Sequence, residues 1–317
     1  MAVVLPGEKF AAIAVTEVGL SDAFPNSIDL KNDLLAMTHP PVDIGTVWGS
    51  WLGDIIVREL EKAKLWLVAK MPSAMPHIVN DENKRLKETV GYLFHALLLA
   101  CPIQIGIAVR LNGGNDGTMA IRGYEQLDHY FHTTGLEALL GRADLDLARR
   151  LMDGLVALHT AGAWERVGRG LQAFWHGLTE RYFQDRLHQF VRCLEGVTKP
   201  EIRSTRSQFT HRCQTFTGAS PAARQILKEC FDIRSHVEHL HNWKDALPHV
   251  SLGEQYKRLG SHLRRIETLS RHVYKRLATD NAIVDLFQDA SLDTFWQLRD
   301  DERHKKWGAV LDITAIH

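Results

Sequence analysis

The chain has 317 residues, of which 45% are hydrophobic and 24% charged, and its 38 basic side chains balance 38 acidic ones. That composition is ordinary for a globular protein and leaves room for two domains. The four cysteines are scattered and include no Cys-x-x-Cys pair, which excludes a zinc ribbon or a thioredoxin-like site and fits a reducing compartment.

We expect a soluble, cytoplasmic protein without a membrane segment. The first residues, MAVVLPGEK, have no basic region ahead of their apolar residues and so do not resemble a signal peptide. The longest apolar stretch, residues 93–109, contains His95, Pro102 and Gln104 and is barely long enough to cross a bilayer. We interpret it as a buried helix that runs into a strand.

Residues 1–160 mix both kinds of secondary structure, which predicts a smaller α+β domain. The expected strands are residues 10–18, 65–68, 105–111 and 119–122, the last two forming a β-hairpin around the sequence NGGNDG. The expected helices are residues 83–100 and 136–159, where apolar side chains recur at helical spacing.

Residues 161–317 are helical almost throughout and predict an up-and-down helical bundle. Good start signals support this, such as Ser220 followed by Pro221, and Pro200 at the opening of the preceding helix. The expected helices are residues 164–182, 185–197, 200–216, 221–243, 251–279 and 291–308. The predicted fold class is thus mainly α, with the α+β domain preceding the bundle.

The expected helix at residues 251–279 has one apolar and one basic face. An apolar stripe packs into the bundle, namely Tyr256, Leu259, Leu263, Ile266, Leu269, Val273 and Leu277. The opposite face carries Lys257, Arg258, Arg264, Arg265, Arg271, Lys275 and Arg276. Residues 161–279 hold 20 basic and 11 acidic side chains, a net charge of +9, so the remainder carries −9. Such a segment suits a polyanion or an acidic docking face.

Two conspicuous patterns favour structural roles. The sequence NGGNDG lacks the Gly-Lys-Ser/Thr that opens a helix in a phosphate-binding loop, so a hairpin tip is the better interpretation. Trp48 and Trp51 lie three residues apart on an expected helix, where tryptophans usually fill a core instead of forming a ligand platform.

The pattern Arg-x-x-x-x-His occurs three times, as RSQFTH from Arg206, RSHVEH from Arg234 and RDDERH from Arg299. The pattern alone therefore proves little, and context separates the three. RDDERH lies in a run of charges, and RSQFTH has few large apolar neighbours. RSHVEH follows the apolar segment ILKECFDI in a helix with a clear start, which makes it the strongest candidate for a functional site.

That context is similar to a known family. The segments ILKECFDIRSHVEH and LRRIETLSRHVYKRL resemble the C-terminal part of HEPN domains, especially the Apea-like group. Upstream, RVGRGLQAFWHGLTERYFQDRLHQFVRCLEGV resembles the family's arginine-rich first helix and the helix of aromatic and Leu-Glu residues that follows. The resemblance covers about residues 164–277. Family members often have Val-His-Gly where this chain has Glu-His-Leu.

The resemblance implies a metal-independent endoribonuclease that needs no cofactor and cleaves RNA by 2′-OH attack. It assigns His239 as general acid or base and Arg234 as phosphate clamp, supported by Ser235, His236 and Glu238. The basic-face residues Arg264, Arg265 and Arg271 would bind RNA. Relatives act as toxins or antiviral-defence effectors on targets such as tRNA or phage transcripts.

Helix geometry adds a condition to this hypothesis. Five residues on a regular helix separate Arg234 and His239 by about 140°, so the two do not share a face. The resemblance implies a homodimer in which two motifs meet across a two-fold axis. The N-terminal domain would then sense, inhibit or recruit a regulatory partner.

Two alternatives remain open. The first is a catalytically silent helical domain that binds RNA or a protein, with Arg234 paired to Glu238 at i+4. The second is a metal-dependent enzyme that uses His236, His239 and His241, although His239 and His241 point to different helix faces.

Overall fold

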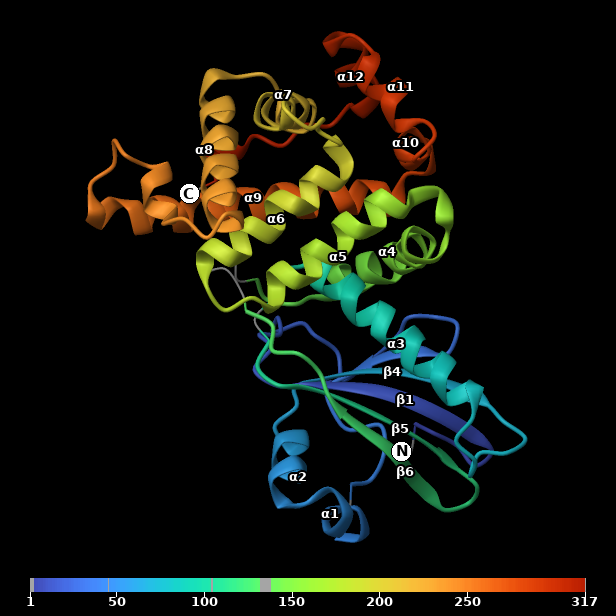
Figure 1. The fold of residues 1–317 in the computed structure, drawn as a ribbon. Helices are drawn as coiled ribbons and strands as arrows, with labels where there is room; N and C mark the ends of the chain where they lie inside the picture. Colours follow the sequence, from blue (N-terminus) through green and yellow to red (C-terminus); the bar gives the residue numbers. More distant parts are fainter. Residues whose placement is uncertain (1–2, 45, 104, 132–137, 317) are drawn as a thin grey trace. The chain divides into compact units, whose positions relative to one another are not determined.

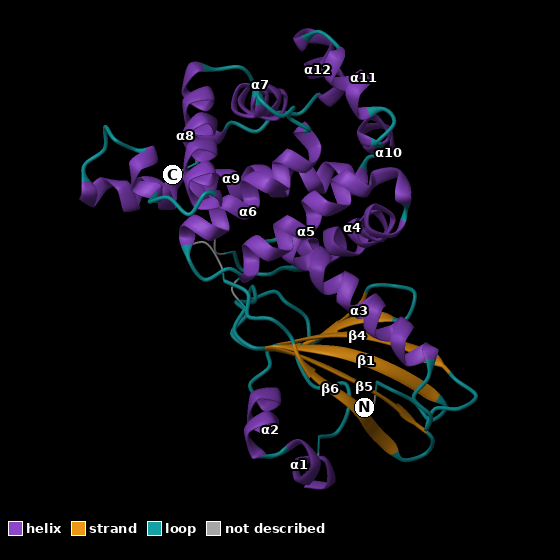
Figure 2. Ribbon diagram, in the orientation of Figure 1, coloured by secondary structure: helices purple, strands orange, loops and turns teal. Residues whose placement is uncertain are grey.

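The computed structural model describes residues 3–44, 46–103, 105–131 and 138–316 (Figure 1). The chain divides into an N-terminal unit that ends at Met152 and a C-terminal unit that begins at Asp153. The division lies within helix α4 (Arg142–Thr160). The fold is mainly helical, with one small antiparallel sheet in the N-terminal part (Figure 2). Among the described residues no helix is both long enough and apolar enough to cross a membrane.

The N-terminal unit is built on a six-stranded sheet in the order β2-β3-β4-β1-β5-β6. The strands are β1 (Glu8–Val15), β2 (Ser27–Asp29), β3 (Leu34–Met37), β4 (Leu65–Pro72), β5 (Ala108–Asn115) and β6 (Met119–Gln126). Strand β1 is central because its sequence, EKFAAIAV, is apolar on both faces and is covered on both sides. The short strands β2 and β3 had no sequence signal strong enough to predict them.

Helices cover both faces of this sheet. Helix α3 (Asp81–Ala100) packs across β1 and β4, and Asn80 caps its first turn. The short helices α1 (Thr46–Leu52) and α2 (Asp54–Glu61) lie against the other face, where Phe10 and Trp66 form a core (Figure 1). Trp48 packs against that core as expected, but Trp51 is 56% exposed, so the core prediction was wrong for this residue.

Two glycines of NGGNDG allow close backbone contacts in the predicted hairpin of β5 and β6. A Cβ on Gly113 would lie 1.9 Å from the Ala120 carbonyl oxygen, and one on Gly114 would lie 2.0 Å from that of Pro76. Both glycines therefore allow backbones to approach closely, and β5 continues through them as far as Asn115. The hairpin tip is shorter than the sequence suggested.

The C-terminal unit is a bundle centred on α6, which packs against α5, α8 and α9. Helices α5 and α6 form a helical hairpin, and α7 packs on α8 (Figure 1). The helices are α5 (Glu165–Thr179), α6 (Phe183–Thr198), α7 (Thr205–Thr217), α8 (Pro221–Glu238), α9 (Leu252–Thr279), α10 (Asn281–Val284), α11 (Leu292–Gln297) and α12 (Asp300–Trp307).

Four predicted helix boundaries need correction. The helix expected over 136–159 begins at Arg142, and residues 136 and 137 lie outside the described residues. The helix expected from residue 200 begins only at Thr205, and the one expected over 291–308 is two helices, α11 and α12, because Leu298 and Arg299 are extended. Helix α8 ends at Glu238 instead of residue 243. Leu240 adopts φ 57°, and the amide of His241 donates to the His236 carbonyl at 2.8 Å, a C-terminal turn that usually contains glycine.

Candidate functional site

Helix α8 carries the RSHVEH motif and is anchored at both ends. At its start, the Ser220 hydroxyl accepts a hydrogen bond from the Ala223 amide at 3.0 Å, with Pro221 in the first turn as predicted. Leu227 and Ile233 are fully buried and fix the helix in the bundle. The motif therefore occupies the last turn of a rigid helix, and His239 is the first residue beyond it.

Arg234 points toward α6, where four side chains form what we call the arginine cluster: His188, Glu195, Arg234 and Glu238. The Arg234 Nη2 atom lies 2.9 Å from Glu195 Oε2 and 3.9 Å from Glu238 Oε2. His188 Nε2 lies 2.9 Å from the same Glu238 oxygen. The predicted i+4 pair with Glu238 is thus present, but Glu195 is the closer partner.

Burial decides the protonation of this cluster. It raises the pKa of the Glu195 carboxyl, and the guanidinium of Arg234 opposes that rise. It lowers the pKa of the His188 imidazole, and the Glu238 carboxylate opposes the shift. His188 is therefore neutral at neutral pH. Arg234 uses Nη2 in its ion pairs with Glu195 and Glu238, which leaves Nη1 for a further acceptor such as a phosphate oxygen.

His239 lies directly after the last residue of α8, in what we call the histidine cluster: His236, His239 and His241. The His241 ring centroid is 6.0 Å from that of His236 and 6.2 Å from that of His239. The His236 Nδ1 donates to the Asp232 carbonyl at 2.9 Å, which fixes the orientation of its ring. His239 is exposed.

One chain therefore brings Arg234 to Glu195 and His239 to His241. Five residues on a regular helix would place Arg234 and His239 about 140° apart. Ser235 contributes its carbonyl, which accepts from the His239 amide at 3.2 Å and so closes the helix. Among the described residues, no group of three or more histidine, cysteine or carboxylate side chains is arranged to hold a metal ion.

The proposed basic face of α9 needs correction at Arg271. Its side chain is only 8% exposed, and its Nη2 lies 2.7 Å from Glu267 Oε1 inside the bundle. The fully buried Arg186 also contacts this carboxylate, at 3.3 Å. Arg271 thus belongs to a buried ionic triad and has no open face for RNA. Arg264 and Arg265 are half-buried, and Arg265 Nε donates to the Ile316 carbonyl at 3.0 Å.

The sequence analysis named neither Glu195 nor His188. Glu195 lies 39 positions before Arg234, so only the packing of α6 on α8 brings the two together. A signal for Glu195 was present in the Leu-Glu pair of the upstream segment that resembles the HEPN helix. His188 gave no signal, since a single histidine on a helix has no characteristic spacing.

A second, partly buried cluster joins α8 to α9. Glu229 accepts from Arg258 Nε at 2.7 Å and Arg258 Nη2 at 2.8 Å, and its Oε2 lies 2.7 Å from His262 Nε2. Burial alone would raise the pKa of Glu229, but the hydrogen bonds from His262, Arg258 and Gln225 lower it from 4.5 to about 2. Glu229 is therefore ionised wherever the bundle is folded near neutral pH.

Because of this cluster, we expect the bundle to be less stable in acid. Because the folded pKa of Glu229 lies below the unfolded one, its contribution is present above pH 4.5 and is lost as the pH falls toward 2. The free energy of unfolding should drop by about 2–3 kcal/mol over this window. Urea denaturation at the two ends of the window measures the drop. It should be smaller in Glu229→Gln and unchanged in Glu254→Gln; equal pH dependence in Glu229→Gln and wild type would contradict the assignment.

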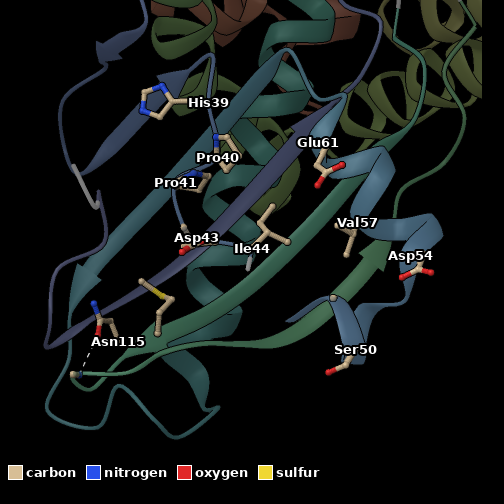
Figure 3. Close-up of a pocket in the computed structure, with 14 residues that line it drawn as sticks. His39, Pro40, Pro41, Asp43, Ile44, Ser50, Asp54, Val57, Glu61 and Asn115 are labelled. Carbon is tan, nitrogen blue, oxygen red and sulfur yellow. Dashed lines mark hydrogen bonds between the residues drawn. The ribbon is translucent and has the colours of Figure 1, made fainter. Parts of the chain in front are cut away.

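The N-terminal unit holds a separate open hollow of about 1160 Å³, beside α2 and the β5–β6 hairpin (Figure 3). Apolar side chains such as Val57 and Ile44 line it together with the carboxylates of Asp43, Asp54 and Glu61. This acidic lining is unsuited to phosphate. It contains none of the residues that the sequence analysis singled out as a site.

In comparisons with known proteins, no protein-family model, curated protein or solved structure matches the chain.

Proposed function

We propose that the C-terminal unit is an HEPN-type endoribonuclease that cleaves RNA without a metal ion or another cofactor. In this proposal the bundle around α6, α8 and α9 is HEPN-like, and RSHVEH is its catalytic motif. His239 is the general acid or base and Arg234 is the phosphate clamp. The N-terminal unit is the regulatory part, which receives a partner that controls cleavage.

The chemistry needs only the RNA and these side chains. A base takes the proton of the ribose 2′-OH, and the oxygen attacks the adjacent phosphorus. The bond to the 5′-oxygen of the next nucleotide breaks, and an acid returns a proton to that oxygen. The products carry a 2′,3′-cyclic phosphate and a 5′-hydroxyl. A guanidinium on the phosphate oxygens stabilises the charge that develops in the transition state.

The observation that carries the proposal is the arrangement at the end of α8. Arg234 is held in one orientation by Glu195, at 2.9 Å, and keeps Nη1 for a substrate. His239 follows the last helical residue and exposes its ring. A fixed guanidinium can hold the phosphate, and an accessible imidazole can take the 2′-OH proton or return one to the 5′-oxygen.

A second copy of the chain completes the site in this proposal. Because five residues on a regular helix would place Arg234 and His239 about 140° apart, one copy offers each group without its counterpart. Leu240, directly after His239, is 96% exposed, as an apolar side chain at an interface would be before association. A homodimer that buries Leu240 would bring the histidine of one protomer toward the arginine of the other.

Product chemistry tests the proposed function. Single-stranded RNA incubated with the protein in EDTA should be cut, leaving 2′,3′-cyclic phosphate and 5′-hydroxyl ends that are resolved by mass spectrometry. A DNA oligonucleotide of the same sequence should remain intact because it has no 2′-OH. Cleavage that stops in EDTA, or products with 3′-hydroxyl and 5′-phosphate ends, would overturn the proposal.

One observation favours a second candidate, a catalytically silent domain that binds RNA or a protein. Arg234 already has two carboxylates within 3.9 Å, as a purely structural arginine would. Intact RNA after long incubation, together with retained RNA binding, would select this candidate.

A further inference from the structure

A second polar surface lies at the opposite end of α8 from the histidine cluster. It is an open hollow of about 780 Å³ between α7, the start of α8 and the first residue of α12. Three basic side chains line it, Arg206, Arg224 and Lys228, against one carboxylate, Asp300. We call it the basic hollow. The RSQFTH match lies on its α7 wall, where Arg206 and His211 are among the lining residues, although the sequence analysis favoured RSHVEH instead.

Two of its cations are available to a ligand. Arg206 forms an ion pair with Asp232, whereas Arg224 and Lys228 have no ion pair with any described residue. Both are exposed and lie four residues apart, so they share one face of α8. Neutral hydrogen-bonding groups surround them, from Ser207, Thr210, Gln214 and Gln225. Two free cations among hydroxyl and amide groups form a surface that suits phosphate.

The basic hollow continues toward the RSHVEH motif. A second hollow, of about 380 Å³, shares Arg206, Gln225 and Lys228 with it and extends to His236 and His249. Lys228, Asp232 and His236 follow one another at intervals of four on the same stripe of α8, and the distance from Lys228 to His236 is about 12 Å. The stripe therefore leads from the free cations to the histidine cluster.

The carboxylates along this stripe are mostly neutralised by neighbours. Asp232 is paired with Arg206, and Glu229 is paired with Arg258 and His262. Asp245 is the remaining carboxylate in the second hollow. A phosphate chain following the stripe would thus meet two free cations first and little unpaired negative charge afterwards.

We propose that the basic hollow binds the phosphate backbone of a single-stranded RNA, and that the strand follows α8 from Arg224 and Lys228 to His236 and His239. The proposal rests on the proposed function for the identity of the polyanion. It replaces Arg271 with Arg224 and Lys228 as RNA-binding residues. Phosphate contacts carry no base information, so the surface holds and aligns the strand without choosing its sequence.

The test measures binding separately from cleavage. A fluorescein-labelled single-stranded RNA is titrated by anisotropy with the His239→Ala protein and with the same protein carrying Arg224→Ala and Lys228→Ala. Loss of both cations should weaken binding on the order of tenfold and reduce the slope of log K against log salt by about 1.4. The weakening should be equal for RNAs of different sequence.

A matched control removes the same two charges elsewhere. Lys84 and Arg85 are exposed on α3 in the other unit, so Lys84→Ala with Arg85→Ala should leave binding unchanged. Equal affinity of the Arg224/Lys228 variant and its parent would overturn the proposal, even in a protein that cleaves RNA. A nucleoside triphosphate that loses affinity in that variant while RNA does not would assign the hollow to a free phosphate compound and would also overturn it. Weakened RNA binding in a chain that never cleaves RNA would support the hollow and refute only the proposed function.

Discussion

Replacing His239 by alanine should lower the rate of RNA cleavage by about 10²–10⁴-fold, the usual contribution of a general acid or base. The side chain is exposed and lies beyond the last residue of α8, so its removal opens no cavity in the bundle. Single-turnover cleavage of a labelled RNA in EDTA measures the loss. RNA affinity, measured by anisotropy, should change little because His239 acts on the proton and not on the phosphate.

Two matched variants show whether the loss belongs to this histidine. His241→Ala removes the neighbouring ring, 6.2 Å away, and His304→Ala removes the histidine of the RDDERH match on α12. Both should cleave RNA within a few-fold of wild type, since neither has an assigned proton-transfer role. If His239→Ala cleaves as well as wild type, or if His241→Ala shows the larger loss, the assignment of His239 is refuted.

Mixing inactive variants tests the shared site. If Arg234 of one protomer acts with His239 of its partner, a dimer of Arg234→Ala with His239→Ala contains one complete site. Random exchange of subunits should then restore about a quarter of the wild-type activity, because half of the dimers are mixed and each has one of two sites. Two variants that stay inactive after mixing would place both residues in the same protomer.

The helical bundle was predictable because its signals are local. The start of α8 at Ser220 and Pro221 is a pattern within one helix, and so is the apolar stripe of α9 from Leu259 to Leu277. Tyr256, which was expected to open that stripe, is 57% exposed, so the prediction was wrong for this residue. The end of α8 was not predictable, since Leu240 occupies a turn position in which glycine is the usual signal. Every partner missed in the site, Glu195 above all, lies on another helix, and no pattern within α8 records which helix it packs against.

Arg271 also shows that a pattern within one helix does not reveal the contacts that other helices make with it. Its place beside basic neighbours indicated a solvated face, yet the middle of α9 is covered on more than one side by the bundle. A helix covered in this way can bury charge if the opposite charge is buried with it. Glu267, four residues earlier, and Arg186 on α6 supply that pairing, which a single-helix pattern does not reveal.

The second large effect that we expect is a loss of stability when the buried triad of Arg186, Glu267 and Arg271 is broken. Glu267 is 1% exposed and is the carboxylate between Arg186, also 1% exposed, and Arg271. Arg186 Nε donates in addition to the Gly177 carbonyl at 3.2 Å, and the Arg271 guanidinium lies 5.3 Å from the Phe174 ring centroid. Both guanidinium groups are thus held largely in the bundle interior, by contacts with α5, α6 and α9.

Glu267→Gln should therefore reduce the free energy of unfolding of the C-terminal unit by about 3–5 kcal/mol, because two buried positive charges lose their counter-charge. Urea denaturation followed by tryptophan fluorescence measures the change. Glu254→Gln on the same helix breaks an exposed pair with Lys257 and should leave the free energy of unfolding nearly unchanged, because solvent screens exposed pairs. The triple change Arg186→Met, Glu267→Leu and Arg271→Met removes all three charges and should recover most of the loss, since well-packed apolar side chains can replace a buried ionic group. A Glu267→Gln protein as stable as the Glu254→Gln control would show that water or another partner neutralises the two arginines and that the triad is not what holds α6 and α9 together.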